Sequence, residues 1–258
     1  TFGFPIELTS EIALERGKTV DMEGFVKART KHEEVSSVGK LKVILTGEEA
    51  LGNVLKQHGT TVFSGYQNLV DKATILAMIT KDGRLLNEMT EGDEADVILS
   101  RTPFYGESGG QLGDAGYLTN DNGSLQVLDT KKHEGLHIHR VRAVSGTIAS
   151  GEEVKAEVDA ARRKDTILHH SSAHVFHSAV RQIFGIEVTQ AGSQVGPNAM
   201  RFDFSLSKQP SKQELAQVEN LMNEWVRTAS PVNTQVMSID EAKQTGAIAM
   251  FGEKYGDT

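Results

Sequence analysis

Two histidines, His170 and His174, carry the clearest candidate chemistry in this sequence. The pattern of residues 167–185 predicts a helix, so rings four positions apart project from adjacent turns of one face. Two imidazoles placed in this way can share one metal ion. The alternative is a polar helix face whose histidines are packed or solvated. His177 continues the same stripe but is too distant to join one tetrahedral ion, so we expect it to pack or to contact substrate at the rim of the site.

A glycine-rich stretch, residues 104–117, is the second candidate. Its five glycines indicate unusual backbone angles or the close approach of a ligand. It is not a phosphate-binding loop, because the Lys-Ser/Thr ending is missing, and it lacks the strand–helix context of a dinucleotide fingerprint. The functional interpretation is a stiff loop that presents Glu107, Ser108 and Gln111, with Gly109 and Gly110 between them. The alternative is a set of tight β-turns with a structural role.

Polar residues near two expected strands form the third candidate. Arg201 and Asp203 lie on the same side of a strand, where they can pair with each other or with a ligand. Gln190, followed by Gly192 and Ser193, can hydrogen-bond a substrate group. Polar residues are common at strand ends, so this group also has a purely structural interpretation.

The elements that must position these residues begin with a β-rich region. Short strand-like segments with turn signals between them predict a small closed barrel rather than a parallel sheet. Asp82-Gly83 and Asn122-Gly123 are hairpin signals. The expected strands are 40–45, 60–63, 72–79, 96–99, 116–118, 125–128, 136–141 and 154–158, with a short helix at 48–58.

Helices are expected before and after this barrel in the sequence. The domains we expect are a helical linker segment at 1–37, a β-barrel subdomain at 38–159 and an α+β unit at 160–258, with helices on an antiparallel sheet. In the linker, Thr9 is predicted to cap a helix that Gly17 ends, and a second helix follows at 22–34. The α+β unit is predicted to contain the histidine helix, strands at 187–190, 200–204 and 232–237, and helices opened by capping boxes at Ser211 and Ser238.

Charge and composition limit the function classes. A net charge of −8 argues against a strongly basic nucleic-acid binder, although one basic face can still contact RNA. The best basic footprint, whose alternative is an ordinary solvated surface, comprises the run 160–164 with Lys131, Lys132, His137, His139, Arg140 and Arg142. The chain has no cysteine, which removes thiolate nucleophiles and ligands. Neither a membrane-spanning run nor a signal peptide is evident, and we expect a cytoplasmic protein, with an organelle as the open alternative. The first residue is not Met, which suggests a fragment.

The order of these motifs resembles the editing region of alanyl-tRNA synthetases along essentially the whole chain. Residues 101–116 are similar to the family's loop Arg-Thr-Pro-Phe-Tyr-x-Glu-Ser-Gly-Gly-Gln-x-Gly-Asp-x-Gly. His170 and His174 match the family's His-x-x-x-His. Gln190, Gly192-Ser193 and the run 201–204 match the Gln, Gly-Ser and Arg-Phe-Asp-Phe that follow, and 246–257 matches Gly-Ala and Phe-Gly-Glu-Lys-Tyr-Gly-Asp.

The resemblance implies a β-barrel subdomain followed by an α+β editing core of the kind shared with threonyl-tRNA synthetase. The implied activity is hydrolysis of seryl and glycyl esters of alanine tRNA, because a site for alanine rejects these neighbours imperfectly. The implied partner is the acceptor end of that tRNA; no membrane is involved, and the oligomeric state stays open. The implied site comprises Gln190 as catalytic residue, with Glu107, Ser108, Gly109, Gly110, Gln111, Arg201 and Asp203 binding substrate.

The resemblance also implies a zinc cofactor, held by His170, His174 and a later Cys-x-x-x-His. The sequence ends at Thr258, before such a motif, so half of the ligand set is present and we expect weak zinc affinity. Ala173 stands where the family usually has Thr, which removes a hydroxyl beside the second histidine. Two other interpretations stay open: a tRNA-binding module without activity, and a freestanding trans-editing hydrolase.

Overall fold

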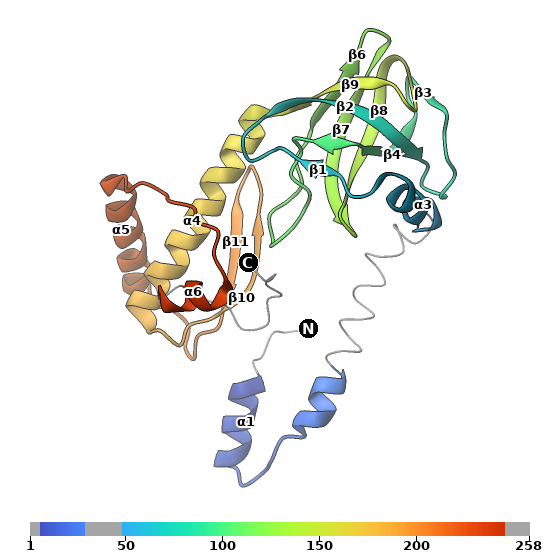
Figure 1. Cartoon of the computed structure of the whole chain (residues 1–258). Coiled ribbons are helices and arrows are strands. Elements are labelled where there is room, and N and C mark those ends of the chain that lie inside the picture. Colours follow the sequence, from blue (N-terminus) through green and yellow to red (C-terminus); the bar gives the residue numbers. More distant parts are fainter. Residues whose placement is uncertain (1–5, 29–47, 246–258) are drawn as a thin grey trace. The chain divides into compact units, whose positions relative to one another are not determined.

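The computed structural model describes residues 6–28 and 48–245, and its elements divide between two compact units (Figure 1). Unit 1 takes in the described residues up to Leu168 together with Val195–Ala199. Unit 2 takes in His169–Gln194 and the described residues from Met200 onward. The predicted strand at 40–45, the Gly246 helix stop and the motif at 246–257 lie outside the described residues.

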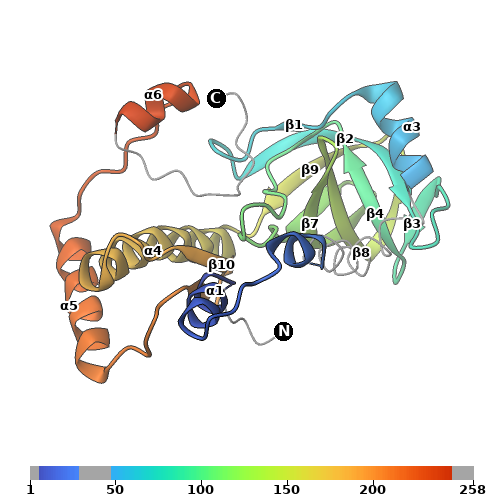
Figure 2. The ribbon, with the colours of Figure 1, turned by 90° about the horizontal axis from the view of Figure 1, so that it is seen from below.

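Six antiparallel strands form a closed ring in unit 1. Their order is β8-β4-β2-β9-β6-β7, and β7 pairs with β8 to complete the circle, while β3 adds to β8. The predicted closed barrel and the mixed helix-and-strand class are therefore confirmed (Figure 2). The strands are β2 (Val70–Ile79), β3 (Glu88–Thr90), β4 (Glu94–Leu99), β6 (Gly116–Asn120), β7 (Gly123–His133), β8 (Leu136–Ala149) and β9 (Glu153–Val158).

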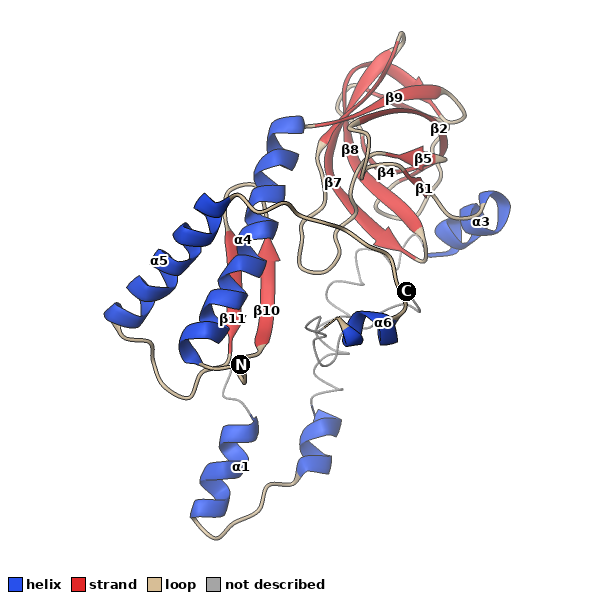
Figure 3. Cartoon of the chain, turned by 60° about the vertical axis from the view of Figure 1, so that its left-hand side comes forward, coloured by secondary structure: helices blue, strands red, loops and turns tan. Residues whose placement is uncertain are grey.

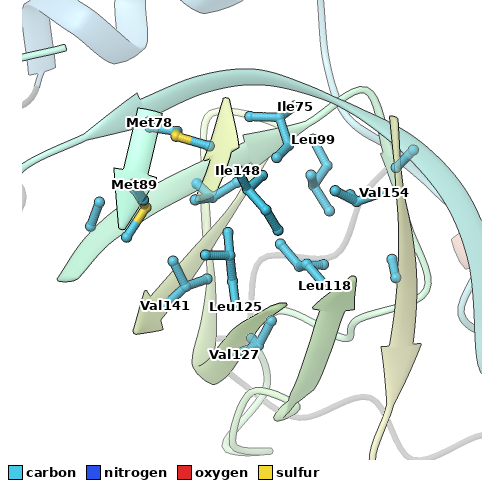
Figure 4. Packing of buried hydrophobic residues seen from close by; sticks show 14 of the residues in the cluster. Ile75, Met78, Met89, Leu99, Leu118, Leu125, Val127, Val141, Ile148 and Val154 are labelled. Carbon is cyan, nitrogen blue, oxygen red and sulfur yellow. The ribbon is translucent and has the colours of Figure 1, made fainter. Parts of the chain in front are cut away.

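Alternating side chains explain why these segments form a barrel. In β9, Val154, Ala156 and Val158 are buried, and the charged residues between them are exposed. Inward-facing aliphatic side chains from all the strands of the ring meet in one core (Figure 4). Full burial of each such Val, Leu or Ile contributes about 1.5–3 kcal/mol. The predicted Asn122-Gly123 hairpin is confirmed, since Asn120 pairs with Gly123 across the β6–β7 turn. The Asp82-Gly83 turn is confirmed as well, with Gly83 at φ +83°.

Two smaller features complete unit 1. Helix α3 (Glu48–His58) has the predicted bounds, and its Leu51 and Val54 pack against the outer side of the barrel. The short strand β1 (Val62–Phe63) pairs in parallel with β5 (Arg101–Thr102). This pairing places the turn after β1 beside the start of the glycine-rich loop.

The histidine helix, α4 (Ala160–Phe184), begins at Ala160 rather than at residue 167. Asp159 starts it, because its carboxylate accepts a hydrogen bond from the backbone N–H of Arg162 at 2.9 Å. The prediction was wrong here because the run 160–164 was interpreted as a surface footprint instead of a first helical turn.

Arg163, in this first turn, makes a buried ion pair with Asp114 of the glycine-rich loop. Its side chain is 9% exposed and that of Asp114 is 3% exposed. The guanidinium also donates to the carbonyl oxygens of Gly65 at 2.8 Å and Pro103 at 2.9 Å. Asp114 in addition accepts the backbone N–H of Tyr105 at 2.7 Å. One side chain therefore fixes three separate segments of unit 1.

The predicted basic footprint is wrong for several of its members. His137 and His139 are buried at 4% and 0% exposure, and Arg163 is the buried partner of Asp114. Arg140 and Arg142 are paired with carboxylates of β4, Asp96 and Glu94, respectively. Lys131 and Lys132 are exposed. Alternation along β7 and β8 turns these side chains to opposite faces of the barrel, which a count of basic residues does not reveal.

The two buried histidines of β8 are held neutral in different ways. His139 bonds Thr102 Oγ1 at 2.8 Å and the Val97 carbonyl at 2.9 Å, and burial lowers its pKa to about 3. His137 stacks on Phe63, and neither of its ring nitrogens has a partner in the described part of the chain. Burial, with a smaller contribution from the charge of Lys132, lowers the pKa of His137 to about 4.

Unit 2 packs two helices and a β-hairpin together. Strands β10 (Gln190–Val195) and β11 (Met200–Phe204) pair with each other, and α5 (Lys212–Thr228) lies alongside α4 (Figure 3). A buried cluster holds this unit together. It comprises Ala179 and Val180 of α4, Val218 of α5, and Val188, which lies between α4 and β10. The two predicted capping boxes are confirmed: Ser211 and Glu214 open α5, and Ser238 and Glu241 open α6 (Ile239–Gln244).

Three other local predictions are wrong. Helix α1 (Ile6–Glu15) contains Thr9 instead of starting after it. Gly17 ends this helix with φ +64°, as expected. The described part of the second predicted helix is 22–28. The chain turns at Ile186 and Glu187 after Gly185. Of the residues 187–190 predicted as a strand, only Gln190 belongs to one. Residues 232–237 form no strand with any described residue, and Val232 and Val236 are 87% and 86% exposed. Their alternating pattern lacks a partner strand, without which strand propensity gives no ladder.

Substitution of Arg163 by Ala tests the importance of the buried ion pair. Removing one partner leaves an uncompensated buried carboxylate, so the free energy of unfolding should fall by about 3–5 kcal/mol. Arg142→Ala, which breaks an exposed pair with Glu94, is the matched control and should cost less than about 1 kcal/mol. Urea denaturation followed by circular dichroism measures both. Equal losses in the two variants would show that the buried pair has no special role.

Substitution of His137 by Phe tests the pH dependence of stability. The pKa of His137 is lower in the folded state, at about 4, than its ordinary value of 6.5, so the unfolded chain binds the extra proton between these values. Stability contributed by the neutral ring is complete above pH 6.5 and is lost as the pH falls towards 4. In His137→Phe, the slope of unfolding free energy against pH should be shallower by up to about 1.4 kcal/mol per pH unit in this window. The exposed His58, changed to Ala, is the control, and an unchanged slope in His137→Phe would contradict the assignment.

Candidate functional site

His170 and His174 lie together on α4, as their spacing predicts. Their ring centroids are 5.1 Å apart and the ring planes are inclined by 24°. His170 is partly buried and His174 is exposed. Partial burial is the larger cause, and the nearby ring of His174 the smaller cause, of a pKa of His170 below its ordinary value. The ring of His170 is therefore neutral at pH 7. A neutral imidazole is the form that binds metals and accepts protons.

His177 packs inside unit 2 instead of extending the pair. It is 8% exposed, and its ring lies 5.3 Å from that of Phe202 on β11. Burial lowers its pKa, an effect that a hydrogen bond with the backbone of Val188 partly offsets. Of the two roles that the sequence left open for this histidine, packing is the one observed. Ala173, before His174, is likewise buried at 7% exposure.

The donor set at the pair suits zinc in part. Two imidazoles on adjacent helical turns match two positions of a tetrahedral site. Among residues 6–28 and 48–245, however, no group of three or more His, Cys, Asp or Glu side chains is placed to hold a metal ion. A metal ion at this pair would therefore need further ligands from outside the described residues.

The β10–β11 hairpin gathers the polar residues of the third candidate. The amide nitrogen of Gln190 donates to Ser193 Oγ at 3.0 Å, which orients its carbonyl oxygen away from that hydroxyl. Arg201 Nε lies 3.1 Å from Asp203 Oδ2, with the two side chains 67% and 46% exposed. Gly192 lets Asp203 approach β10, because a Cβ at Gly192 would lie 3.2 Å from that carboxylate. Ser193 is the partner that fixes Gln190, a role that spacing alone does not reveal.

A two-residue turn forms the tip of the glycine-rich loop. Ser108 and Gln111 exchange backbone hydrogen bonds of 3.1 and 3.0 Å. Gly109 and Gly110 between them have φ +56° and +80°, the pattern of a type I′ turn. Ser108 and Glu107 are exposed, and Lys131 Nζ lies 4.0 Å from the Glu107 carboxylate. Gln111 is only 6% exposed, so the expectation that the loop presents this side chain is wrong.

The rest of the loop is held rigidly by its backbone. Leu112 N donates to Val195 O at 2.9 Å, and Val195 N donates to Gly110 O at 2.8 Å. Val195 belongs to unit 1 like the loop itself. Gly113 passes so close to β7 that a Cβ would lie 2.0 Å from the Thr130 carbonyl oxygen. The stretch is thus both a set of tight turns and a stiff loop.

The predicted site residues fall into both units. Glu107–Gln111 belong to unit 1, whereas His170, His174, Gln190, Arg201 and Asp203 belong to unit 2. Within each unit the structure brings neighbours together in pairs. The buried pair of Asp114 with Arg163, which positions the loop, was missed from sequence, although a carboxylate in a glycine-rich turn and an Arg in a capped first turn were both visible signals.

Comparisons with known proteins point in one direction. A family model described as tRNA synthetases class II (A) matches residues 1–162. An alanine–tRNA ligase of Synechocystis is 41% identical over 99% of this chain, one of Thermus thermophilus is 41% identical over 100%, and one of Haemophilus influenzae is 40% identical over 100%. The chain spans only 29% of the length of each of these relatives. No helix among the described residues is long and apolar enough to cross a membrane.

Proposed function

Since the chain belongs to the family of class II tRNA synthetases (A), and its relatives are alanine–tRNA ligases, we propose that it is the part of such a ligase that hydrolyses wrongly charged alanine tRNA. The observation that carries this proposal is the stacked His170–His174 pair in unit 2. In this proposal unit 1 is the barrel subdomain and unit 2 is the editing core. The partner is the acceptor end of tRNA for alanine.

The proposed reaction is hydrolysis of an aminoacyl ester. Water adds to the ester carbonyl carbon, the bond from that carbon to the ribose oxygen breaks, and the ribose oxygen takes up a proton. The products are the free amino acid and uncharged tRNA. Serine and glycine are the expected amino acids, because an alanine pocket excludes one extra hydroxyl poorly and cannot exclude a smaller side chain.

The residues of unit 2 supply polar groups suited to this substrate. His170 is neutral at pH 7, so with His174 it can bind zinc, which when bound would supply a Lewis acid that polarises a carbonyl or orients the substrate. Ser193 fixes the amide nitrogen of Gln190, which leaves the carbonyl oxygen to accept a hydrogen bond from water or from the substrate ammonium group. Asp203 and Arg201 are exposed enough to contact the tRNA terminal ribose and phosphate. In unit 1, Glu107 and Ser108 are the exposed side chains of the loop proposed to bind substrate.

Measuring release of serine from seryl-tRNA for alanine tests the proposal. The chain with zinc added should accelerate release above the rate without protein. His170→Ala, His174→Ala and Gln190→Ala should each lower that rate at least about tenfold, as expected for groups that touch the reacting ester or its metal. His169→Ala, a change at the neighbouring position of the same helix, is the matched control and should retain the activity.

Zinc binding gives a second readout that is independent of turnover. Titration with a competing chelator should show weak binding that weakens further, by at least about tenfold, in His170→Ala and His174→Ala but not in His169→Ala. If all three variants bind zinc like the parent chain, the metal assignment is wrong. If seryl-tRNA is bound but never hydrolysed, the chain is a tRNA-binding module and the hydrolase proposal fails.

A further inference from the structure

Three aromatic rings and a lysine gather at the start of the glycine-rich loop in unit 1. Phe63 contacts Tyr66 edge-on, with centroids 5.0 Å apart, and Tyr105 edge-on at 6.2 Å. Lys132 Nζ lies 5.7 Å from the Phe63 ring centroid and 5.4 Å from that of Tyr105. We call these four side chains the aromatic–lysine cluster. They come from β1, the turn after it, the loop and β7, and the proposed hydrolysis uses none of them.

The outer part of this cluster faces solvent. Tyr66 is 84% exposed, Lys132 is exposed, and Phe63 and Tyr105 are partly buried. The buried ring of His137 packs against the cluster. It stacks on Phe63 with the ring centroids 5.3 Å apart and the planes inclined by 7°, and His137 is only 4% exposed. The exposed ring of Tyr66 therefore extends a cluster of rings, and clustered exposed rings mark interaction sites more often than isolated ones.

The turn that carries Tyr66 is fixed on both sides. Ser64 donates its N–H to Thr102 O at 2.9 Å and its hydroxyl to Asp71 at 2.7 Å. The carbonyl oxygen of the next residue, Gly65, accepts a hydrogen bond from Arg163. There is no space for a side chain at Gly65, because a Cβ would lie 2.2 Å from Pro103 O. The exposed ring therefore stands on an ordered backbone, which reduces the entropy lost when a ligand stacks on it.

The chemistry of the cluster favours single-stranded RNA over other occupants. Exposed aromatic faces bind unpaired bases by stacking without regard to sequence, and cations between them bind the phosphates. Lys132 provides such a cation at the rings, 5.7 Å from the Phe63 centroid and 5.4 Å from the Tyr105 centroid. A double helix hides its base faces, so the rings select for unpaired nucleotides.

We propose that the aromatic–lysine cluster binds an unpaired RNA segment, with one base stacked on Tyr66 and its phosphate near Lys132. This inference deepens the proposed function and rests on it for the identity of the RNA, the single-stranded end of alanine tRNA. It assigns to the barrel of unit 1 a binding role that does not depend on the histidine pair.

Binding of an RNA hairpin with the acceptor-stem sequence of alanine tRNA and an unpaired ACCA end tests this inference. Fluorescence anisotropy should show that Tyr66→Ala weakens binding about tenfold, the effect of losing one stacked base, while Tyr66→Phe, which keeps the ring, binds like the parent chain. Tyr117→Ala removes another exposed barrel tyrosine, 46% exposed on β6, and should have no effect. A hairpin without the ACCA end should bind Tyr66→Ala and the parent chain equally.

Outcomes for this inference and for the hydrolase proposal can be separated. If Tyr66→Ala binds the ACCA hairpin as tightly as the parent chain, or loses no more affinity than Tyr117→Ala, the cluster is not an RNA site, whatever the hydrolysis assay shows. If the parent chain fails to hydrolyse seryl-tRNA but Tyr66→Ala weakens hairpin binding, the hydrolase proposal fails and the RNA site stands. Thermal unfolding of Tyr66→Ala should match the parent chain, because the ring is exposed and its removal empties no core.

Discussion

The guanidinium of Arg163, with its Nε 3.0 and 2.9 Å from the two carboxylate oxygens of Asp114, is the interaction on which the arrangement of unit 1 depends. Burying both charges is expensive, and it is tolerated only where the remaining donors and acceptors are also satisfied. Here the remaining donors meet the Gly65 and Pro103 carbonyls, and the carboxylate also accepts the Tyr105 N–H. The start of α4, the glycine-rich loop and the turn that carries Tyr66 therefore have to keep one relative geometry. Both the proposed substrate loop and the proposed RNA surface inherit their order from this pair.

Local patterns in the sequence predict most of the fold. Alternating side chains in β9, the Asn122-Gly123 turn and the Ser211 and Ser238 capping boxes are each encoded within a few residues, and each is found as expected. Long-range partners are not encoded in this way. The burial of His139 follows from Thr102 and Val97, which lie far from it in the chain, and no count of basic residues distinguishes it from a surface group. The segment 232–237 shows the converse, a strand-like pattern without a strand beside it among the described residues.

In the candidate site, too, the contacts that follow from local periodicity could be predicted from the sequence, and those that depend on distant residues could not. The approach of His170 to His174 and of Arg201 to Asp203 follows from helical and strand periodicity, so it was predictable. The bond from Gln190 to Ser193 and the burial of Gln111 depend on how the hairpin and the loop close, which the sequence does not state. The chemical roles proposed for these residues rest on the resemblance to the family, whereas the structure gives their neighbours. Structure and resemblance are complementary here, because one gives neighbours and the other gives a reaction.

Closure of the barrel also has a kinetic side. Strand β9 closes the ring by pairing with both β6 and β2, and in the second pairing Val70 faces Glu157 across a long stretch of chain. Such a contact forms late, because the entropy of closing so large a loop is lost before the pairing returns any stability. During synthesis from the N-terminus, β2 leaves the ribosome well before β9 exists, and its apolar residues stay open to solvent for that interval. Until β9 pairs, the ring is a curved sheet with two free edges, and free strand edges favour pairing with other chains.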